Sequence, residues 1–184
     1  MMTSTDRQYE QAAASCREIF IKKTLDYGTS WRVLRPISVT DQLYIKAKRI
    51  RTIQENEVQK ISDDISSEFR GIVNYALIGL IQSDLDNEEP DELAVDTAAG
   101  LYDDKLVAAK ALMENKNHDY GEAWREMSQE SFTDLILSKL LRIKQILSNK
   151  GKTLISEGID ANYFDIINYA LFALILIDEK KHSA

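Results

Sequence analysis

The sequence contains two similar halves, and this duplication constrains the fold more than any other feature of the chain. One set of matched positions, separated by 93 residues, pairs Lys23, Asp26, Tyr27, Gly28, Trp31 and Arg32 with Lys116, Asp119, Tyr120, Gly121, Trp124 and Arg125. The same displacement relates Ser38, Thr40, Asp41, Lys46, Arg49 and Ile50 to Ser131, Thr133, Asp134, Lys139, Arg142 and Ile143. After a slip of one residue, the segment Asn-Tyr-Ala-Leu at 74–77 returns at 168–171. Agreement at so many spaced positions indicates an internal repeat of one structural unit.

Each half is predicted to form three helices. The chain has only two prolines and seven glycines, and it lacks the sustained two-residue alternation that is typical of strands. We expect the first helix at 5–27, where Thr5 and the residue three positions later resemble a capping box. The third helices are expected at about 61–83 and 155–181. Gly28 fits the position just after a helix, where φ is positive.

These patterns predict an all-α fold in which a three-helix unit is duplicated in tandem to form one pseudo-twofold helical bundle. We place the first repeat at 1–84 and the second at 97–184. The segment 85–96 between them is acidic and contains Pro90, as expected of an exposed linker. The third helix of each half is apolar nearly all round, so we expect these two helices to be central and the repeats to share one core.

Composition and charge exclude several classes of function. The 184 residues carry a formal net charge of −7 with a pI near 5.0, which argues against binding a nucleic-acid backbone, since that requires a basic surface. No run of uncharged apolar residues approaches 18 and no secretory leader pattern is present, so we expect a cytoplasmic protein without membrane contact. The single cysteine cannot form an intramolecular disulfide, and two histidines give little support for a histidine metal site.

The strongest functional segment is the last helix of the second half. One stripe of this helix carries Glu157, Ala161, Asp165 and Asn168, while the rest is apolar. A buried carboxylate requires a cation, a basic partner or a raised pKa. Asp165 therefore predicts either a site for Mg²⁺ or a substrate, because hard divalent ions prefer oxygen ligands, or a buried ion pair with a basic residue of the preceding helix.

Comparison of the two halves favours a special role for Asp165. Asn168 matches Asn74 in the first half, but Asp165 matches Gly71. The fold therefore tolerates the loss of this carboxylate. We expect the acidic side of any catalytic centre to lie in the second half, with Asn74 and Asn168 orienting a ligand.

Both middle helices carry a basic pair, Lys46 with Arg49 and Lys139 with Arg142. Two cations one helical turn apart repel slightly, so their recurrence requires a reason. One interpretation is a clamp for a phosphate, in which arginine supplies a planar fork and lysine a point charge. The other is that these residues lie at a solvated edge or pair with acidic residues of neighbouring helices.

Asp41 and Asp134 are interpreted as parts of helix caps. Each stands three residues after a serine, Ser38 or Ser131, that we expect to be the N-cap of a middle helix. An acidic residue at the third helical position favours the positive end of the helix dipole.

The Asp-Tyr-Gly element leaves two interpretations open. Asp119 and Tyr120, with Asp26 and Tyr27 in the first half, either face a ligand at a mouth between helices or lie at a simple helix end. In the second case Lys23 and the lysine that matches it hold the aspartates in ordinary salt bridges.

The order of these motifs resembles a known family. Lys-x-x-Asp-Tyr-Gly, then Lys-x-x-Arg, then Asp-Ile-Ile-Asn-Tyr-Ala-Leu is similar to the helical family called nucleotide modification associated domain 1, with one copy in each half. That family looks related to the MazG-like and dimeric dUTPase-like all-α nucleoside triphosphate pyrophosphohydrolases. Those enzymes hold Mg²⁺ with Glu-x-x-Glu and Glu-x-x-Asp motifs on neighbouring helices.

The resemblance implies a Mg²⁺-dependent nucleotide pyrophosphohydrolase. Glu157 and Asp165 match acidic positions of the helical motif, and Glu157 to Asp160 reads as Glu-x-x-Asp. We expect Glu157, Asp160 and Asp165 to hold the metal, with Glu157 and Asp165 catalytic, and Lys139 and Arg142 to hold phosphates. The sequence departs from the motif at Ala161 and has no Glu-x-x-Glu on the middle helices.

The alternative is a non-catalytic module, either a nucleotide sensor or a self-associating helical scaffold. In this interpretation the polar stripe around Asp165 is a buried network, and the partner is a small-molecule nucleotide or a second copy of the chain in a homodimer. The sensor binds a nucleotide without hydrolysing it, whereas the scaffold binds none.

Overall fold

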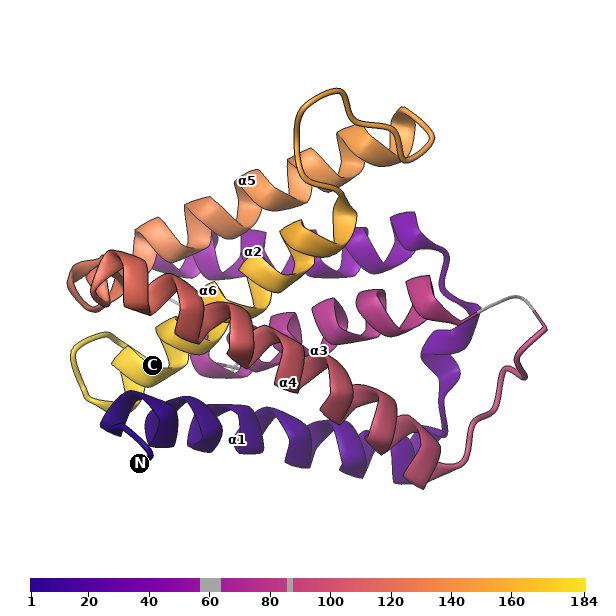
Figure 1. Cartoon of the computed structure of the whole chain (residues 1–184), viewed down its shortest axis with the longest axis horizontal. Helices are drawn as coiled ribbons and strands as arrows, with labels where there is room; N and C mark the ends of the chain where they lie inside the picture. Colours follow the sequence, from indigo (N-terminus) through magenta and orange to yellow (C-terminus); the bar gives the residue numbers. More distant parts are fainter. Residues whose placement is uncertain (57–63, 86–87) are drawn as a thin grey trace.

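The computed structural model describes residues 1–56, 64–85 and 88–184, and these residues form helices and connecting segments without strands (Figure 1). The described helices are α1 (Ser4–Tyr27), α2 (Pro36–Asn56), α3 (Ile65–Asp84), α4 (Val95–Tyr120), α5 (Gln129–Ser148) and α6 (Ile159–Asp178), with 3₁₀ turns at Ser30–Val33 and Ala123–Glu126. The prediction of an all-α fold is confirmed. The first three helices correspond in order to the last three, as a tandem duplication requires.

Helices α3 and α6 form the centre of the bundle. They pack most extensively against each other, with α2 and α5 on one side and α1 and α4 on the other (Figure 1). One continuous apolar cluster includes buried residues of both repeats, among them Phe69 and Leu77 of α3 and Ile166 and Leu171 of α6. The central placement follows from composition, because a helix that is apolar nearly all round is stable in water only when other helices cover it.

Helix α6 is long and apolar enough to cross a membrane, judged by length and composition alone. Within this fold, however, 67% of its most apolar stretch is buried against other helices. A core helix has the same composition as a membrane span. The burial of α6 agrees with the role of a central core helix.

Matched tyrosines and asparagines link the two repeats through buried hydrogen bonds. The hydroxyl of Tyr9 in α1 donates to Oδ1 of Asn168 at 2.7 Å, and Tyr102 in α4 donates to Oδ1 of Asn74 at 2.8 Å. Each asparagine also donates a hydrogen bond through Nδ2 to the first helix of its own repeat. Asn74 donates to the backbone carbonyl of Cys16 in α1 at 3.0 Å, and Asn168 donates to a backbone carbonyl of α4 at 3.1 Å. Each repeat therefore supplies the donor for the other repeat's buried amide.

Two of the predicted helix starts are wrong. Ser38 lies inside α2, which begins with Pro36, and the fixed φ of proline suits the first helical position. Ser131 lies inside α5, whose N-cap is Ser128, and the hydroxyl of Ser128 accepts from the backbone N–H of Ser131 at 3.1 Å. Helix α1 has the predicted kind of capping box, but two residues earlier, with N-cap Thr3.

Asp41 and Asp134 are not part of helix caps, because their helices begin earlier. They form ion pairs across the two repeats instead. Asp41 lies 3.1 Å from Nζ of Lys144, and Asp134 lies 3.8 Å from Nη1 of Arg51, at matched positions of α2 and α5. These side chains are largely exposed, so the pairs orient the two helices more than they stabilise them.

The predicted glycine positions after the first helix of each repeat are confirmed. Gly28 follows α1 with φ of 65°, and Gly121 follows α4 with φ of 62°. A side chain at Gly28 would also meet the carboxylate of Glu92 in the linker. The predicted start of the third helix of the first repeat, 61–63, lies outside the described residues, whereas α6 begins at Ile159 and leaves Glu157 in the preceding loop.

Candidate functional site

Asp165 forms an ion-paired cluster with two lysines of different helices. Its Oδ1 accepts from Nζ of Lys116 in α4 at 2.6 Å, and its Oδ2 lies 2.9 Å from Nζ of Lys139 in α5. The Asp165 side chain is only 12% exposed. Burial acts to raise the pKa of this carboxyl, but hydrogen bonds and charge attraction from the two lysines outweigh it, so the pKa lies below its ordinary value.

This arrangement is the ion pair that the sequence left open as an alternative to a metal site. Lysine donors occupy both oxygens of Asp165, which leaves the carboxylate poorly placed to hold Mg²⁺. Glu157 is exposed in the loop before α6, and Asp160 accepts a hydrogen bond from Ser83 at 3.3 Å. Across 1–56, 64–85 and 88–184, no three His, Cys, Asp or Glu side chains gather as a metal site would require. The described residues do not fit the expected metal site.

The predicted ligand-binding residues do not gather at a single site. Asn74 and Asn168 are buried and hydrogen-bonded within the core, as described above. The Tyr120 side chain is 75% exposed beyond the end of α4. Asp119 is also exposed and lies 3.2 Å from the ring of His118. The salt bridge between Asp119 and Lys116, which was one of the two interpretations, is replaced by the pair that Lys116 forms with Asp165.

The basic pairs of α2 and α5 differ in their partners. In the first repeat, Arg49 donates to Glu68 at 2.6 Å, and Nζ of Lys46 lies 3.9 Å from the other oxygen of Glu68. In the second repeat the position of Glu68 is taken by Asn162, and Lys139 pairs with Asp165. Lys139 and Arg142 both line a surface cavity of about 790 Å³, together with Glu157, Asn162 and the loop before α6.

A cavity of about 610 Å³ opens in the first repeat, among α1, the following 3₁₀ turn, α2 and α3. Its walls combine aromatic and aliphatic side chains with two lysines and one carboxylate; the lining includes Phe20, Lys23, Tyr27, Trp31, Lys46, Glu68, Gly71, Tyr75 and Ile78. Two residues that the sequence predicted to bind a ligand, Lys46 and Asn74, line this cavity, as does Tyr27, for which a ligand-facing position was one interpretation. The exchange of Asp165 for Gly71 was the signal that could have located this cavity.

The cavity exists because smaller residues replace larger ones on one face of α3. In the second repeat, Phe172 stacks on Trp124 with ring centroids 4.2 Å apart. The residue of the first repeat that matches Phe172 is Ile78, and the residue that matches Asp165 is Gly71. Positions 71 and 78 are seven residues apart, so they lie on the same face of the helix and their missing atoms enlarge the same space.

The two tryptophans also differ in hydrogen bonding. In the second repeat, Nε1 of Trp124 donates to Oδ1 of Asn117 at 3.2 Å. The matching residue in the first repeat is Thr24, whose hydroxyl donates to the carbonyl of Phe20 at 2.7 Å. Nε1 of Trp31 is buried and finds no acceptor among the described residues. An unsatisfied buried donor is costly, so the described part of the first repeat lacks a hydrogen bond that the second repeat makes at its matching tryptophan.

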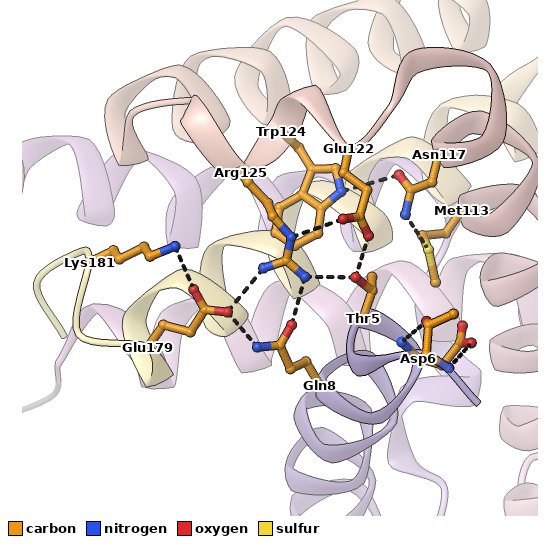
Figure 2. Close-up of polar contacts among 11 residues, drawn as sticks. Thr5, Asp6, Gln8, Met113, Asn117, Glu122, Trp124, Arg125, Glu179 and Lys181 are labelled. Carbon is orange, nitrogen blue, oxygen red and sulfur yellow. Dashed lines mark hydrogen bonds and ion pairs between the residues drawn. The ribbon is translucent and has the colours of Figure 1, made fainter. Parts of the chain in front are cut away.

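The end of the second repeat is closed by a network around Arg125 (Figure 2). The Arg125 guanidinium lies over the ring of Trp124 at 4.4 Å and contacts Glu122 at 3.2 Å and Glu179 at 3.0 Å. It also donates to Thr5 and Gln8 of α1, both at 2.7 Å. In the first repeat the matching Arg32 instead donates to backbone carbonyls of the linker, Glu89 at 3.1 Å and Pro90 at 3.2 Å.

The charges at the first-repeat cavity leave it with cationic character. Arg49 neutralises Glu68 at close range, whereas Lys46 is farther from Glu68 and lies 5.6 Å from the ring centroid of Tyr75. Lys23 is exposed, and no ion pair connects it to the part of the chain that the structure describes. An anion at this cavity would therefore meet two lysines and one carboxylate that already has its own cation.

Comparison with known families supports the duplication. The family model described as nucleotide modification associated domain 1 matches residues 23–83 and 116–177, one segment in each repeat. Neither the curated proteins nor the solved structures contain a significant match to the chain. The matched segments include Lys46 and Gly71 in one copy and Asp165 in the other.

Proposed function

Because the chain belongs to the nucleotide modification associated domain 1 family, we propose that it is a nucleotide-handling protein that binds its nucleotide in the first-repeat cavity. The observation that carries this proposal is that aromatic side chains and two lysines line the same cavity. Aromatic side chains such as Tyr27 and Tyr75 can stack on a base, and Lys23 and Lys46 can bind a phosphate.

The size of the cavity agrees with a ligand of this kind. Sites for small molecules are typically about 300 to 1,000 Å³ and combine apolar walls with a few polar groups. The first-repeat cavity, at about 610 Å³, falls within this range. Trp31 adds a further aromatic side chain to its wall.

The proposed activity is binding without hydrolysis, as in a nucleotide sensor. A pyrophosphohydrolase of the MazG type requires carboxylates that are available to Mg²⁺, but Asp165 is held by two lysines and Glu68 by Arg49. The carboxylate that lines the first-repeat cavity is that of Glu68, and Arg49 already neutralises its charge. Mg²⁺-dependent hydrolysis is the second candidate, favoured by the family resemblance.

A binding and turnover assay separates these candidates. The purified chain is incubated with ribonucleoside and deoxyribonucleoside mono-, di- and triphosphates, with and without Mg²⁺, while thermal stability and released phosphate or pyrophosphate are measured. We expect at least one nucleotide to raise the melting temperature without turnover. At a nucleotide concentration 100 times Kd the stabilisation would be about 2.7 kcal/mol.

Matched lysine variants test the position of the site. Lys46→Met should weaken nucleotide binding, whereas Lys48→Met should not, because Lys48 is exposed on the same helix and does not line the cavity. Absence of any nucleotide-dependent stabilisation would refute the proposal. Mg²⁺-dependent turnover that is abolished in Asp165→Ala would establish the hydrolase instead.

A further inference from the structure

The second repeat fills with its own side chain the place that the first repeat leaves open. Asp165 extends from α6 between Lys116 and Lys139, which contact its two oxygens at 2.6 and 2.9 Å. The matching residues of the first repeat are Gly71, Lys23 and Lys46. Both lysines are kept, but the carboxylate between them is missing.

The surroundings of Gly71 show that the Lys46 side chain lies directly beside this place. A Cβ added to Gly71 would lie 3.0 Å from Cδ and Cε of Lys46 and 3.2 Å from its Nζ. Lys23 and Gly71 line the same cavity as Lys46. The position over Gly71 is therefore the first-repeat counterpart of the Asp165 carboxylate.

We infer that the first repeat binds the phosphoryl group of its ligand over Gly71, between Lys23 and Lys46, where the second repeat holds the Asp165 carboxylate. This inference rests on the proposed function and identifies which group of the nucleotide is recognised and where. In the second repeat Asp165 acts as an internal anion. The chain thus has one open anion site and one that is closed by its own side chain.

Charge supports a phosphoryl group as the occupant. Two lysines that share one anion are stabilised by it, and a phosphate offers more negative charge and more acceptor oxygens than a carboxylate. Glu68 does not fill this role, because its close contact is with Arg49 and its distance to Nζ of Lys46 is 3.9 Å. The anion is left to be supplied from outside the chain.

The repeats differ in two further ways beside the matched tryptophans. Ile78 in place of Phe172 removes the ring that covers the tryptophan in the second repeat. Thr24 in place of Asn117 removes the acceptor of the indole N–H, so that Nε1 of Trp31 is left buried without a partner in the described chain. The second repeat supplies the anion, the aromatic ring and the indole acceptor from its own side chains. Among the described residues, the first repeat supplies neither the ring nor the acceptor, and Lys46 has only the 3.9 Å pair with Glu68.

The test places a carboxylate at position 71. Gly71→Asp should supply the missing internal anion, and Gly71→Asn is its matched control, because asparagine has nearly the same shape without the charge. Binding is followed by ¹H–¹⁵N NMR through the indole N–H signals of Trp31 and Trp124, which occur once in each repeat. The probes are inorganic phosphate, the ribonucleoside 5′-monophosphates and the parent nucleosides.

In the wild type we expect phosphate and at least one monophosphate to shift the Trp31 signal at one site per chain, while the Trp124 signal is unchanged. Gly71→Asp should weaken binding of the monophosphate by about tenfold or more, so that its Kd approaches that of the nucleoside. Gly71→Asn should stay within about threefold of the wild type after the same titration. If Gly71→Asp does not fold, Lys23→Met with Lys46→Met should give the same loss of the phosphate contribution.

The outcomes separate this inference from the proposed function. Equal losses in Gly71→Asp and Gly71→Asn would show a steric effect and overturn the inference, even if nucleotides bind. Binding of nucleosides as tightly as monophosphates would also overturn it while leaving nucleotide binding intact. Conversely, if phosphate binds and Gly71→Asp abolishes this while no nucleotide binds, the anion site stands and the proposed function fails. Absence of binding by every probe would refute both.

Discussion

Removal of the Asp165 carboxylate should destabilise the protein by leaving two lysines without their shared anion. In Asp165→Ala, Lys139 would remain in a largely buried position, since its side chain is 15% exposed and that of Asp165 is 12% exposed. Lys116 can turn into solvent, because its side chain is 53% exposed. The two lysines should therefore contribute very unequally to the loss.

The expected magnitude follows from these exposures. Breaking a buried ion pair by removing one partner costs about 3 to 5 kcal/mol, and we take the low end, about 3 kcal/mol, for Lys139 because some solvent reaches it. A pair with a half-exposed lysine contributes about 0.5 kcal/mol. The sum predicts that Asp165→Ala lowers the free energy of unfolding by about 3.5 kcal/mol.

Urea unfolding followed by circular dichroism measures this loss. A shift of the midpoint at constant slope would show that stability changed, without a change in the surface exposed on unfolding. The matched control is Asp134→Ala, which removes a helical aspartate that is 62% exposed and 3.8 Å from its arginine. We expect this control to lose less than about 0.5 kcal/mol.

A second variant isolates the stranded cation as the cause. Asp165→Ala combined with Lys139→Met replaces the buried pair with apolar groups, a change that is often neutral or stabilising. The double variant should therefore be more stable than Asp165→Ala alone. A loss below about 0.5 kcal/mol in Asp165→Ala, or no recovery in the double variant, would refute the reasoning.

Other predictions concern contacts between the repeats and the acid limb of stability. Tyr9→Phe and Tyr102→Phe should each lower the free energy of unfolding in urea by about 1 to 2 kcal/mol, because each leaves a buried amide oxygen without its donor; a loss in only one would contradict their equivalence. Arg125→Ala should cost about 2 kcal/mol by the same measurement, since it removes charge-assisted bonds to both repeats, and a neutral result would show that solvent replaces them. Because the folded-state pKa of Asp165 is lowered, the stability that its charge provides is complete above the ordinary value of 3.8 and is lost as the pH falls through the folded value. Asp165→Asn should therefore flatten that part of the curve of unfolding free energy against pH, and an unchanged acid limb would assign it to other carboxylates.

The repeated helices could be predicted from the sequence because their signals are local. The apolar character of α3 and α6 predicts that they are buried, and the glycines after α1 and α4 predict helix ends with positive φ. Both expectations are confirmed. The duplication adds a second sample of each signal, so that a position kept in both copies stands out without any other sequence for comparison.

The helix starts of α2 and α5 were less predictable because several nearby residues can cap or begin a helix. Ser38 follows Pro36, and Ser131 follows Ser128, so that two candidates compete within one turn. The residue at which the helix begins depends on the direction in which the preceding 3₁₀ turn leads the chain. Each 3₁₀ turn contains a buried tryptophan, Trp31 or Trp124, so the geometry of the turn depends on tertiary packing.

One interaction of the candidate site could be predicted from residue types before the positions of the residues were known. The sequence identifies Asp165 as a carboxylate that needs a cation and names a basic residue of the preceding helix as one alternative. Lys139 on α5 is that residue, but Lys116 comes from α4, and its contact depends on how α4 lies against α6. A contact between helices that are not adjacent in the chain has no local sequence signal.

By itself, the sequence determined that this protein is a duplicated helical unit with a carboxylate in one copy and glycine in the other. Only the tertiary structure decided what that exchange means. The lysines that surround both positions come from separate helices, so the missing carboxylate becomes an open cationic cavity only once α1, α2 and α3 are packed together. In the second repeat the same packing fills the corresponding space, because Asp165, Phe172 and Asn117 occupy it with their own atoms and hydrogen bonds.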